Sequence, residues 1–104
     1  MTINKFRKHK RFVINKPCKL IIQNKDLLGL IIDFSLTGMK IKCINSLIKK
    51  KEIKIIWSPV PLTKNLNLIA KIKWENHNFF GVKFKELNSQ QQFIISRLIY
   101  YYSQ

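Results

Sequence analysis

The sequence predicts a mainly β protein, a small antiparallel barrel of six strands that is closed by one C-terminal helix. Three observations predict this fold class. Six short segments carry apolar residues at alternate positions, as strands with one buried face do, and turn-forming residues separate them. After Leu87 the apolar spacing becomes helical. This pattern favours a helix-capped barrel, but it gives no strand order and does not distinguish the barrel from an OB-fold or an SH3-like barrel.

The first two predicted strands lie on either side of a short turn. Residues 12–22 alternate apolar and polar side chains, and Pro17 within them indicates an edge or a bulge. Residues 24–26 are predicted to form the turn. The second strand, residues 27–34, is apolar on both faces, so we expect it to be well buried.

Four further strands and one helix complete the predicted fold. The strands alternate cleanly and occupy residues 39–43, 53–57, 66–74 and 80–84. Trp57 and Trp74 fall on these alternations and are predicted to be core residues, although an aromatic near a barrel face could stack on a base. Gly81 indicates a bulge or close packing. A turn is predicted at residues 76–78. For the helix, Ser89 and Gln92 are spaced as a capping box.

The length of 104 residues fits one domain, residues 1–104. Within it we expect a basic N-terminal arm at 1–11, the barrel at 12–86 and the helix at 89–102. The longest aliphatic run, residues 27–32, is far shorter than the roughly twenty residues of a membrane-spanning helix, and no signal peptide is evident. The sequence therefore predicts a cytoplasmic protein without membrane insertion.

The sequence offers few clusters of residues that could bind a metal or catalyse a reaction. Cys18 and Cys43 fall on apolar alternations and are predicted to be small core residues, while His9 and His77 have no partner at metal-ligand spacing. No nucleophile–base pair and no paired carboxylates are present in the sequence. We therefore predict no catalytic residue, no metal and no cofactor, and we do not expect an enzyme.

Charge is the strongest compositional signal. The net charge of +15 implies attraction to an anion, such as nucleic acid, a nucleotide or a membrane surface. Against this, the abundance of Lys, Ile and Asn is typical of an AT-rich genome, so many lysines can be ordinary solvated residues.

The three arginines, Arg7, Arg11 and Arg97, stand out against seventeen lysines. Arginine offers a planar fork that binds bases and phosphates bidentately, which makes the closely spaced Arg7 and Arg11 the first candidates for a specific site.

Two motifs together resemble the signature of the PilZ family. Arg7 and Arg11 form R-x-x-x-R before the first strand, and residues 33–38 form D-x-S-x-x-G after the second. Either motif alone is weak, because basic arms and polar turns are common. The sequence of residues 81–84, G-V-K-F, is also similar to the last barrel strand of that family. The resemblance covers nearly the whole chain and implies a PilZ-type barrel of six antiparallel strands with a C-terminal helix.

The resemblance implies a receptor for the bacterial second messenger cyclic di-GMP. The implied binding residues are Arg7, Arg11, Asp33, Ser35, Gly38 and Lys10. Arginine can dock on the O6/N7 edge of guanine, and an aspartate can accept from its N1 and N2 donors. Ser35 can donate to a phosphate oxygen or hold the turn, Gly38 can take positive φ or allow close approach, and Lys10 can add a phosphate contact.

The implied output is a contact with an unidentified downstream protein. The contact would form when the ligand orders the N-terminal arm, and it would act in motility or biofilm regulation. We expect a monomer or weak dimer. Two alternatives remain. One is a small basic barrel that binds nucleic acid nonspecifically, which the charge favours but which leaves both motifs to coincidence. The other is a PilZ-fold adaptor that binds protein and no nucleotide, although such adaptors usually lack the motif arginines.

Overall fold

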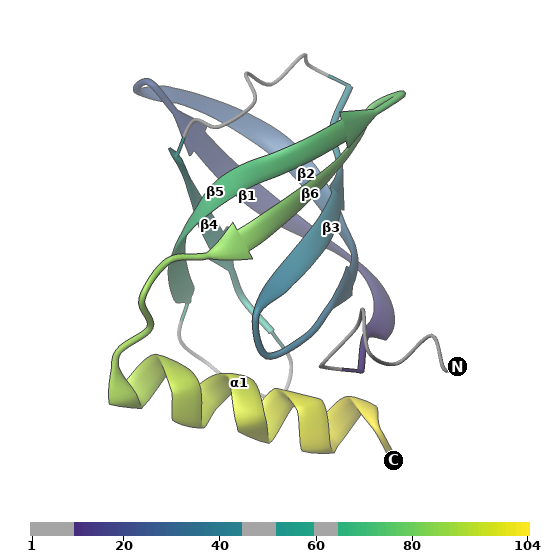
Figure 1. Ribbon diagram of the computed structural model, residues 1–104, viewed down its shortest axis with the longest axis vertical. Coiled ribbons are helices and arrows are strands. Elements are labelled where there is room, and N and C mark those ends of the chain that lie inside the picture. Colours follow the sequence, from purple (N-terminus) through teal and green to yellow (C-terminus); the bar gives the residue numbers. More distant parts are fainter. Residues whose placement is uncertain (1–9, 45–51, 60–64) are drawn as a thin grey trace, which may run out of the picture.

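The computed structural model describes residues 10–44, 52–59 and 65–104. Its six strands form a closed antiparallel barrel in the order β1-β2-β3-β6-β5-β4, and α1 lies across one end of it (Figure 1). The elements are β1 Phe12–Ile22, β2 Lys25–Phe34, β3 Gly38–Lys42, β4 Glu52–Trp57, β5 Leu66–Asn76, β6 Phe79–Phe84 and α1 Ser89–Tyr102. The predicted fold class is confirmed, and the structure adds the strand order.

Alternate residues of every strand fill the barrel interior, as in other small closed barrels. The side chains that are fully excluded from solvent include Leu20, Ile31, Ile41, Ile55, Leu68 and Ile72. Cys18 and Cys43 are also buried, so their interpretation as core residues is confirmed. Burial, with a smaller contribution from nearby Cys43, raises the pKa of the Cys18 thiol to about 12. The thiolate, which is the reactive form, is therefore disfavoured at Cys18.

The β1–β2 and β5–β6 hairpins are connected by tight turns whose residues have positive φ. Gln23 and Asn24 have φ of 50° and 67°, and residues 77–78 repeat this conformation between β5 and β6. Such two-residue turns match the twist of the flanking strands, and asparagine tolerates them well. The predicted turns at 24–26 and 76–78 are wrong in extent, because β2 begins immediately after Asn24 and β5 runs through Asn76.

A bulge interrupts β1 near its start. The register with β2 shifts between Val13 and Lys16, and Asn15 takes φ of 51°. The interruption predicted around Pro17 is thus a bulge at Asn15. Pro17 pairs with Leu30 of β2. The described pairing of β1 with β4 covers only residues 19–21, so the missing N–H of Pro17 removes no hydrogen bond between β1 and β4.

A second bulge changes the position of a tryptophan. Trp57 is buried as predicted, but Trp74 is 41% exposed, so its assignment to the core is wrong. The β5–β6 register shifts between Ile72 and Trp74, which turns the indole to the outer face of the barrel. The indole lies directly over Gly81, where an added Cβ would meet Trp74 Nε1 at 2.0 Å. Gly81 therefore marks close packing opposite a bulge.

The outer face of β2 is less covered than the sequence predicts. Leu28 is 77% exposed, and Leu30 and Ile32 are half-buried, whereas Ile31 and Phe34 on the inner face are fully buried. The expectation of a strand buried on both faces is wrong, because the closed barrel covers only its own interior and α1 lies at the barrel end (Figure 1).

Helix α1 begins with a capping box formed by Asn88 and Gln91, one residue earlier than predicted. Asn88 Oδ1 accepts from the Gln91 backbone N–H at 2.8 Å, and Gln91 Oε1 accepts from the Asn88 N–H at 2.9 Å. The buried face of α1 carries Ile95 and Leu98. Tyr102 also packs edge-on against Phe34, with ring centroids 5.9 Å apart.

The described residues contain no group of three or more His, Cys, Asp or Glu side chains that could hold a metal ion. The part of the chain that the structure describes also has no helix whose length and apolarity would suit a membrane span.

Candidate ligand-binding site at the β2–β3 turn

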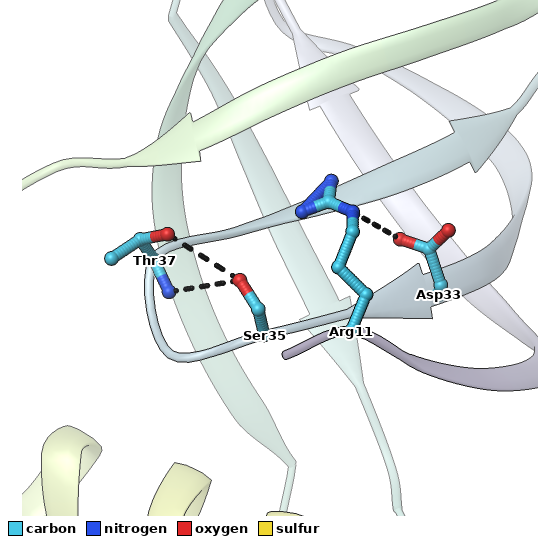
Figure 2. A network of polar contacts seen from close by, with 4 residues as sticks. All are labelled: Arg11, Asp33, Ser35 and Thr37. Atoms are coloured by element: carbon cyan, nitrogen blue, oxygen red, sulfur yellow. Dashed lines mark hydrogen bonds and ion pairs between the residues drawn. The ribbon is translucent and has the colours of Figure 1, made fainter. Parts of the chain in front are cut away.

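The site begins with an ion pair between the two sequence motifs. Arg11 directly precedes β1, and Asp33 lies near the end of β2. In the β1–β2 register Val13 lies opposite Asp33, so the start of β1, and Arg11 before it, lie beside the end of β2. Arg11 Nε lies 3.1 Å from Asp33 Oδ1 (Figure 2). The two side chains are 25% and 14% exposed, so the pair is partly shielded from water.

The Asp33 carboxylate has unused hydrogen-bonding capacity. Its Oδ1 atom is buried, and none of the described residues gives it an aligned hydrogen bond, although the Arg11 guanidinium lies within ion-pair distance. A buried acceptor that lacks a hydrogen bond costs about 1–3 kcal/mol. A ligand carrying N–H donors at this point would therefore gain from meeting Asp33, with Arg11 already beside it.

The turn after Asp33 is held by its own hydrogen bonds. Ser35 is buried, and its Oγ accepts from the Thr37 backbone N–H at 3.2 Å and lies 3.4 Å from Thr37 Oγ1 (Figure 2). The Ser35 N–H donates to the Gly38 carbonyl at 2.9 Å, and the Thr37 carbonyl accepts from the Phe84 N–H at 2.8 Å. Of the two roles considered for Ser35, the structure shows the one that holds the turn.

Of the two reasons considered for Gly38, the structure shows a close approach, here between two strands. None of the glycines has positive φ, so the expectation of a left-handed conformation is wrong. Gly38 instead starts β3 and pairs with Lys83 of β6. A Cβ at this position would lie 2.2 Å from the carbonyl oxygen of Val82. The absent side chain lets β3 approach β6 and so fixes the end of the turn.

The sheet register adds Lys40, which the sequence analysis missed, and aligns Trp74 with it. Asp33 pairs with Lys40, Lys40 pairs with Gly81, and Gly81 pairs with Trp74, so these residues form one line across β2, β3, β6 and β5. Lys40 Nζ lies 5.0 Å from the ring centroid of Phe79. The alternation of β3 is sufficient to place Lys40 on the outer face, whereas Gly81 indicated a bulge or close packing without showing that Trp74 would be exposed.

Arg7 lies outside the described residues. Lys10 does not join this arrangement. Lys10 is exposed, and its ammonium lies over the ring of Phe12, 5.6 Å from the centroid. The structure therefore brings together Arg11, Asp33 and the turn of residues 35–38, and it adds a lysine and an exposed indole on the same outer surface.

Comparisons with known proteins agree on one family. The family model of the PilZ domain matches residues 5–101. No curated protein sequence matches the chain. Among solved structures, the chain is similar to the PilZ domain of CeSA from a cellulose-synthesizing bacterium, with 18% identity, TM-score 0.74, and coverage of 91% of this chain and 99% of that one.

Two further solved structures are similar. The PilZ domain of YcgR from Escherichia coli, determined with c-di-GMP, has 14% identity and TM-score 0.75 and covers 93% of this chain and 91% of that one. The Bacillus subtilis inhibitor of motility, MotI/DgrA, has 13% identity and TM-score 0.66, with coverage of 88% and 48%. At these identities the structural likeness establishes the fold, and the family model matches almost the entire sequence. The chain belongs to the PilZ domain family.

Proposed function

We propose that this protein is a receptor for cyclic di-GMP and not an enzyme. The observation that carries the proposal is the approach of Arg11 to Asp33, at 3.1 Å, beside the turn that Ser35 holds. Two separate motifs of the sequence thus meet on the outer surface of one barrel. The E. coli YcgR domain, which has the same fold and was solved with c-di-GMP, supports this choice of ligand.

The chemistry of each group suits that ligand. The guanidinium of Arg11 can bind the O6/N7 edge of guanine or stack on its face, and Asp33 can accept from N1 and N2. Lys40, and Lys10 and Arg7 of the arm, can neutralise the two phosphodiesters. The exposed indole of Trp74 offers a surface on which a second base can stack. The ligand would then lie across β2, β3, β6 and β5.

Titration calorimetry with cyclic di-GMP, cyclic di-AMP and GTP tests the proposal. We expect a dissociation constant of about 1 μM or lower for cyclic di-GMP, equivalent to about −8 kcal/mol, and markedly weaker binding of the other two. Absence of saturable binding, or equal affinity for all three nucleotides, would contradict it.

Asp33→Ala should relax the preference for guanine. The carboxylate is the group that meets the N1 and N2 donors, which adenine lacks, and a lost base contact of this kind costs about 1–3 kcal/mol in discrimination. The ratio of affinities for cyclic di-GMP and cyclic di-AMP, measured by calorimetry, should therefore fall by roughly tenfold or more. Asp26→Ala is the matched control, because Asp26 is an exposed carboxylate of the same strand, and it should leave the ratio unchanged. Equal ratios in the two variants would rule out this role for Asp33.

We also propose that the ligand orders the N-terminal arm and that this change is the signal. The sequence of residues 1–11 shows no strand alternation and carries five basic side chains that repel one another: Lys5, Arg7, Lys8, Lys10 and Arg11. Two phosphates and two bases can bridge the arm to Asp33 and offset an ordering cost of about 1–2 kcal/mol per backbone residue. The surface so created would be presented to a downstream protein, and we place the output in motility or biofilm regulation in the cytoplasm.

Amide hydrogen exchange should detect this ordering. Protection at residues 5–12 should rise when cyclic di-GMP is added to the wild-type protein. It should not rise in the Arg7→Ala, Arg11→Ala double variant. Full protection before the ligand is added, or none at saturation, would exclude the switch.

Nucleic acid is the second candidate ligand, and one surface favours it. The outer face of β3, β5 and β6 carries Lys40, Lys42, Lys71 and Lys83 together with the rings of Phe79 and Trp74. Lysines interleaved with aromatics suit a single strand. If these four lysines each neutralised one phosphate, raising salt from about 50 to 200 mM would weaken oligo(dT) binding roughly 50-fold, whereas cyclic di-GMP with two phosphates should lose less than about tenfold. A steeper dependence for cyclic di-GMP would favour the nucleic-acid function.

A further inference from the structure

Helix α1 exposes three large aromatic side chains among polar ones. Phe93 and Tyr100 are 63% and 69% exposed and lie on the side of the helix away from the buried Ile95 and Leu98, and Tyr101, 44% exposed, lies at the flank of this side. Exposed aromatic side chains gathered around an arginine are typical of surfaces that contact another protein. We call the exposed residues Phe93, Arg97, Tyr100 and Tyr101 the α1 outer face.

Arg97 is the single charged residue of α1 and the third arginine of the chain. Its guanidinium carbon lies 5.8 Å from the centroid of the Phe93 ring, one helical turn away. It is exposed, and no ion pair joins it to any described carboxylate. Exposed Arg, Tyr and Phe side chains are the types enriched in protein–protein interfaces, and Arg and Tyr are prominent among residues that dominate binding energy.

The neighbouring contacts hold this face in a fixed position. Tyr101 packs edge-on against Tyr102 at 5.0 Å, and Tyr102 packs against Phe34 at 5.9 Å. Gln91 Nε2 also donates to the Asn67 carbonyl at 2.8 Å, which ties the start of α1 to β5. A preformed rigid surface loses little conformational freedom on binding, which favours affinity.

The charges indicate what covers the α1 outer face. Residues 89–102 contain no lysine in a chain that has seventeen, so the face lacks the cation clusters with which proteins bind nucleic-acid phosphates or anionic membranes. The same residues contain no carboxylate. A second copy packed symmetrically on this face would bring together two Arg97 guanidiniums, and two chains of net charge +15, with no carboxylate of α1 to offset them.

We propose that the α1 outer face docks an acidic protein surface that supplies a carboxylate to Arg97 between apolar contacts to Phe93 and Tyr100. The proposal goes beyond nucleotide binding, because Arg97 and Phe93 belong to the helix and not to the strands and turn around Asp33. It gives the receptor a second contact surface, separate from the ligand-ordered arm, and specifies the chemistry of the protein that would bind there.

Site-specific photocrosslinking of the full chain in the cells that produce it tests the proposal. Benzoylphenylalanine replaces Phe93 or Tyr100, and the matched control carries it at Leu28, which is exposed on β2. We expect one adduct with an acidic protein from both helix positions and none from position 28. Formation of the adduct should be lost when Arg97→Glu is added.

The captured protein is then purified and titrated against variants of the receptor. Arg97→Glu and Phe93→Ala should each weaken binding roughly 30-fold or more, as expected for dominant interface residues. Lys54→Glu makes the same charge change on exposed β4 and should weaken binding less than about fivefold. All three variants should bind cyclic di-GMP as the wild type does, so a failure of docking is distinguished from a failure of nucleotide binding.

Three outcomes would overturn the proposal. The first is that positions 93 and 100 crosslink only to a second copy of this chain or to nothing. The second is that Arg97→Glu and Lys54→Glu weaken binding equally, which would indicate general electrostatic attraction. The third is that Phe93→Ala binds as tightly as the wild type.

Discussion

Replacing Arg11 by lysine is expected to lower the affinity for cyclic di-GMP roughly 100-fold. A lysine keeps the charge and can still pair with Asp33, so the barrel should fold normally. It loses the planar fork that docks bidentately on guanine, worth about 1–3 kcal/mol, and much of the stacking on a base face. Together these contacts amount to about 3 kcal/mol, which corresponds to roughly two orders of magnitude in affinity.

Calorimetry on the purified Arg11→Lys variant measures this loss. The matched control is Arg97→Lys, which makes the same chemical change on α1, and it should bind cyclic di-GMP as the wild type does. If Arg11→Lys also binds like the wild type, Arg11 acts only through its charge, and the specific role we assign to it is wrong.

Gly38→Ala is expected to destabilise the fold by about 3 kcal/mol, at the upper end of the usual cost of overpacking. The added Cβ would lie 2.2 Å from the carbonyl oxygen of Val82. Since that oxygen belongs to the backbone, β3 must move away from β6, and the pairing that anchors the turn after Asp33 weakens. For a domain of this size the melting temperature should fall by roughly 15 °C.

Chemical denaturation followed by circular dichroism measures the free energy of unfolding, and Gly29→Ala provides the control. A Cβ at Gly29 would meet Leu20 Cδ1 at 2.9 Å, and this atom is the end of a flexible side chain that can adjust. Gly29→Ala should therefore cost clearly less stability than Gly38→Ala. Equal stability of the two variants would show that the close approach of β3 to β6 does not constrain Gly38.

Most elements of the fold could be predicted from the spacing of apolar residues, because that spacing reflects which side chains face a core. The helix at residues 89–102 has the predicted bounds, and β4 differs by one residue. The strand order could not be predicted, because a period of two says which face is buried and not which strands pair. The alternation predicts a core position for Trp74, and this is wrong because one extra residue in β5 reverses the facing of the residues that follow.

The candidate site was predictable in part. The motif residues Arg11 and Asp33 lie side by side in the structure, as their shared resemblance implied. The register of four strands, which the sequence does not reveal, sets Lys40 beside Asp33 and aligns Trp74 with them two strands further along the sheet. Gly38 permits a close approach between two strands, and the atom that it approaches belongs to a residue more than forty positions away in the sequence.

The most direct test of the receptor function is a titration of the isotope-labelled protein with cyclic di-GMP, followed by two-dimensional NMR. The two tryptophans provide an internal comparison, because Trp74 lies on the outer face and Trp57 is buried. We predict saturable shifts at Arg11, at the turn of residues 33–38 and at the indole N–H of Trp74, with no comparable shift for Trp57. Shifts that never saturate, or that spread over the lysines and leave Asp33 and Trp74 unchanged, would contradict the proposed site.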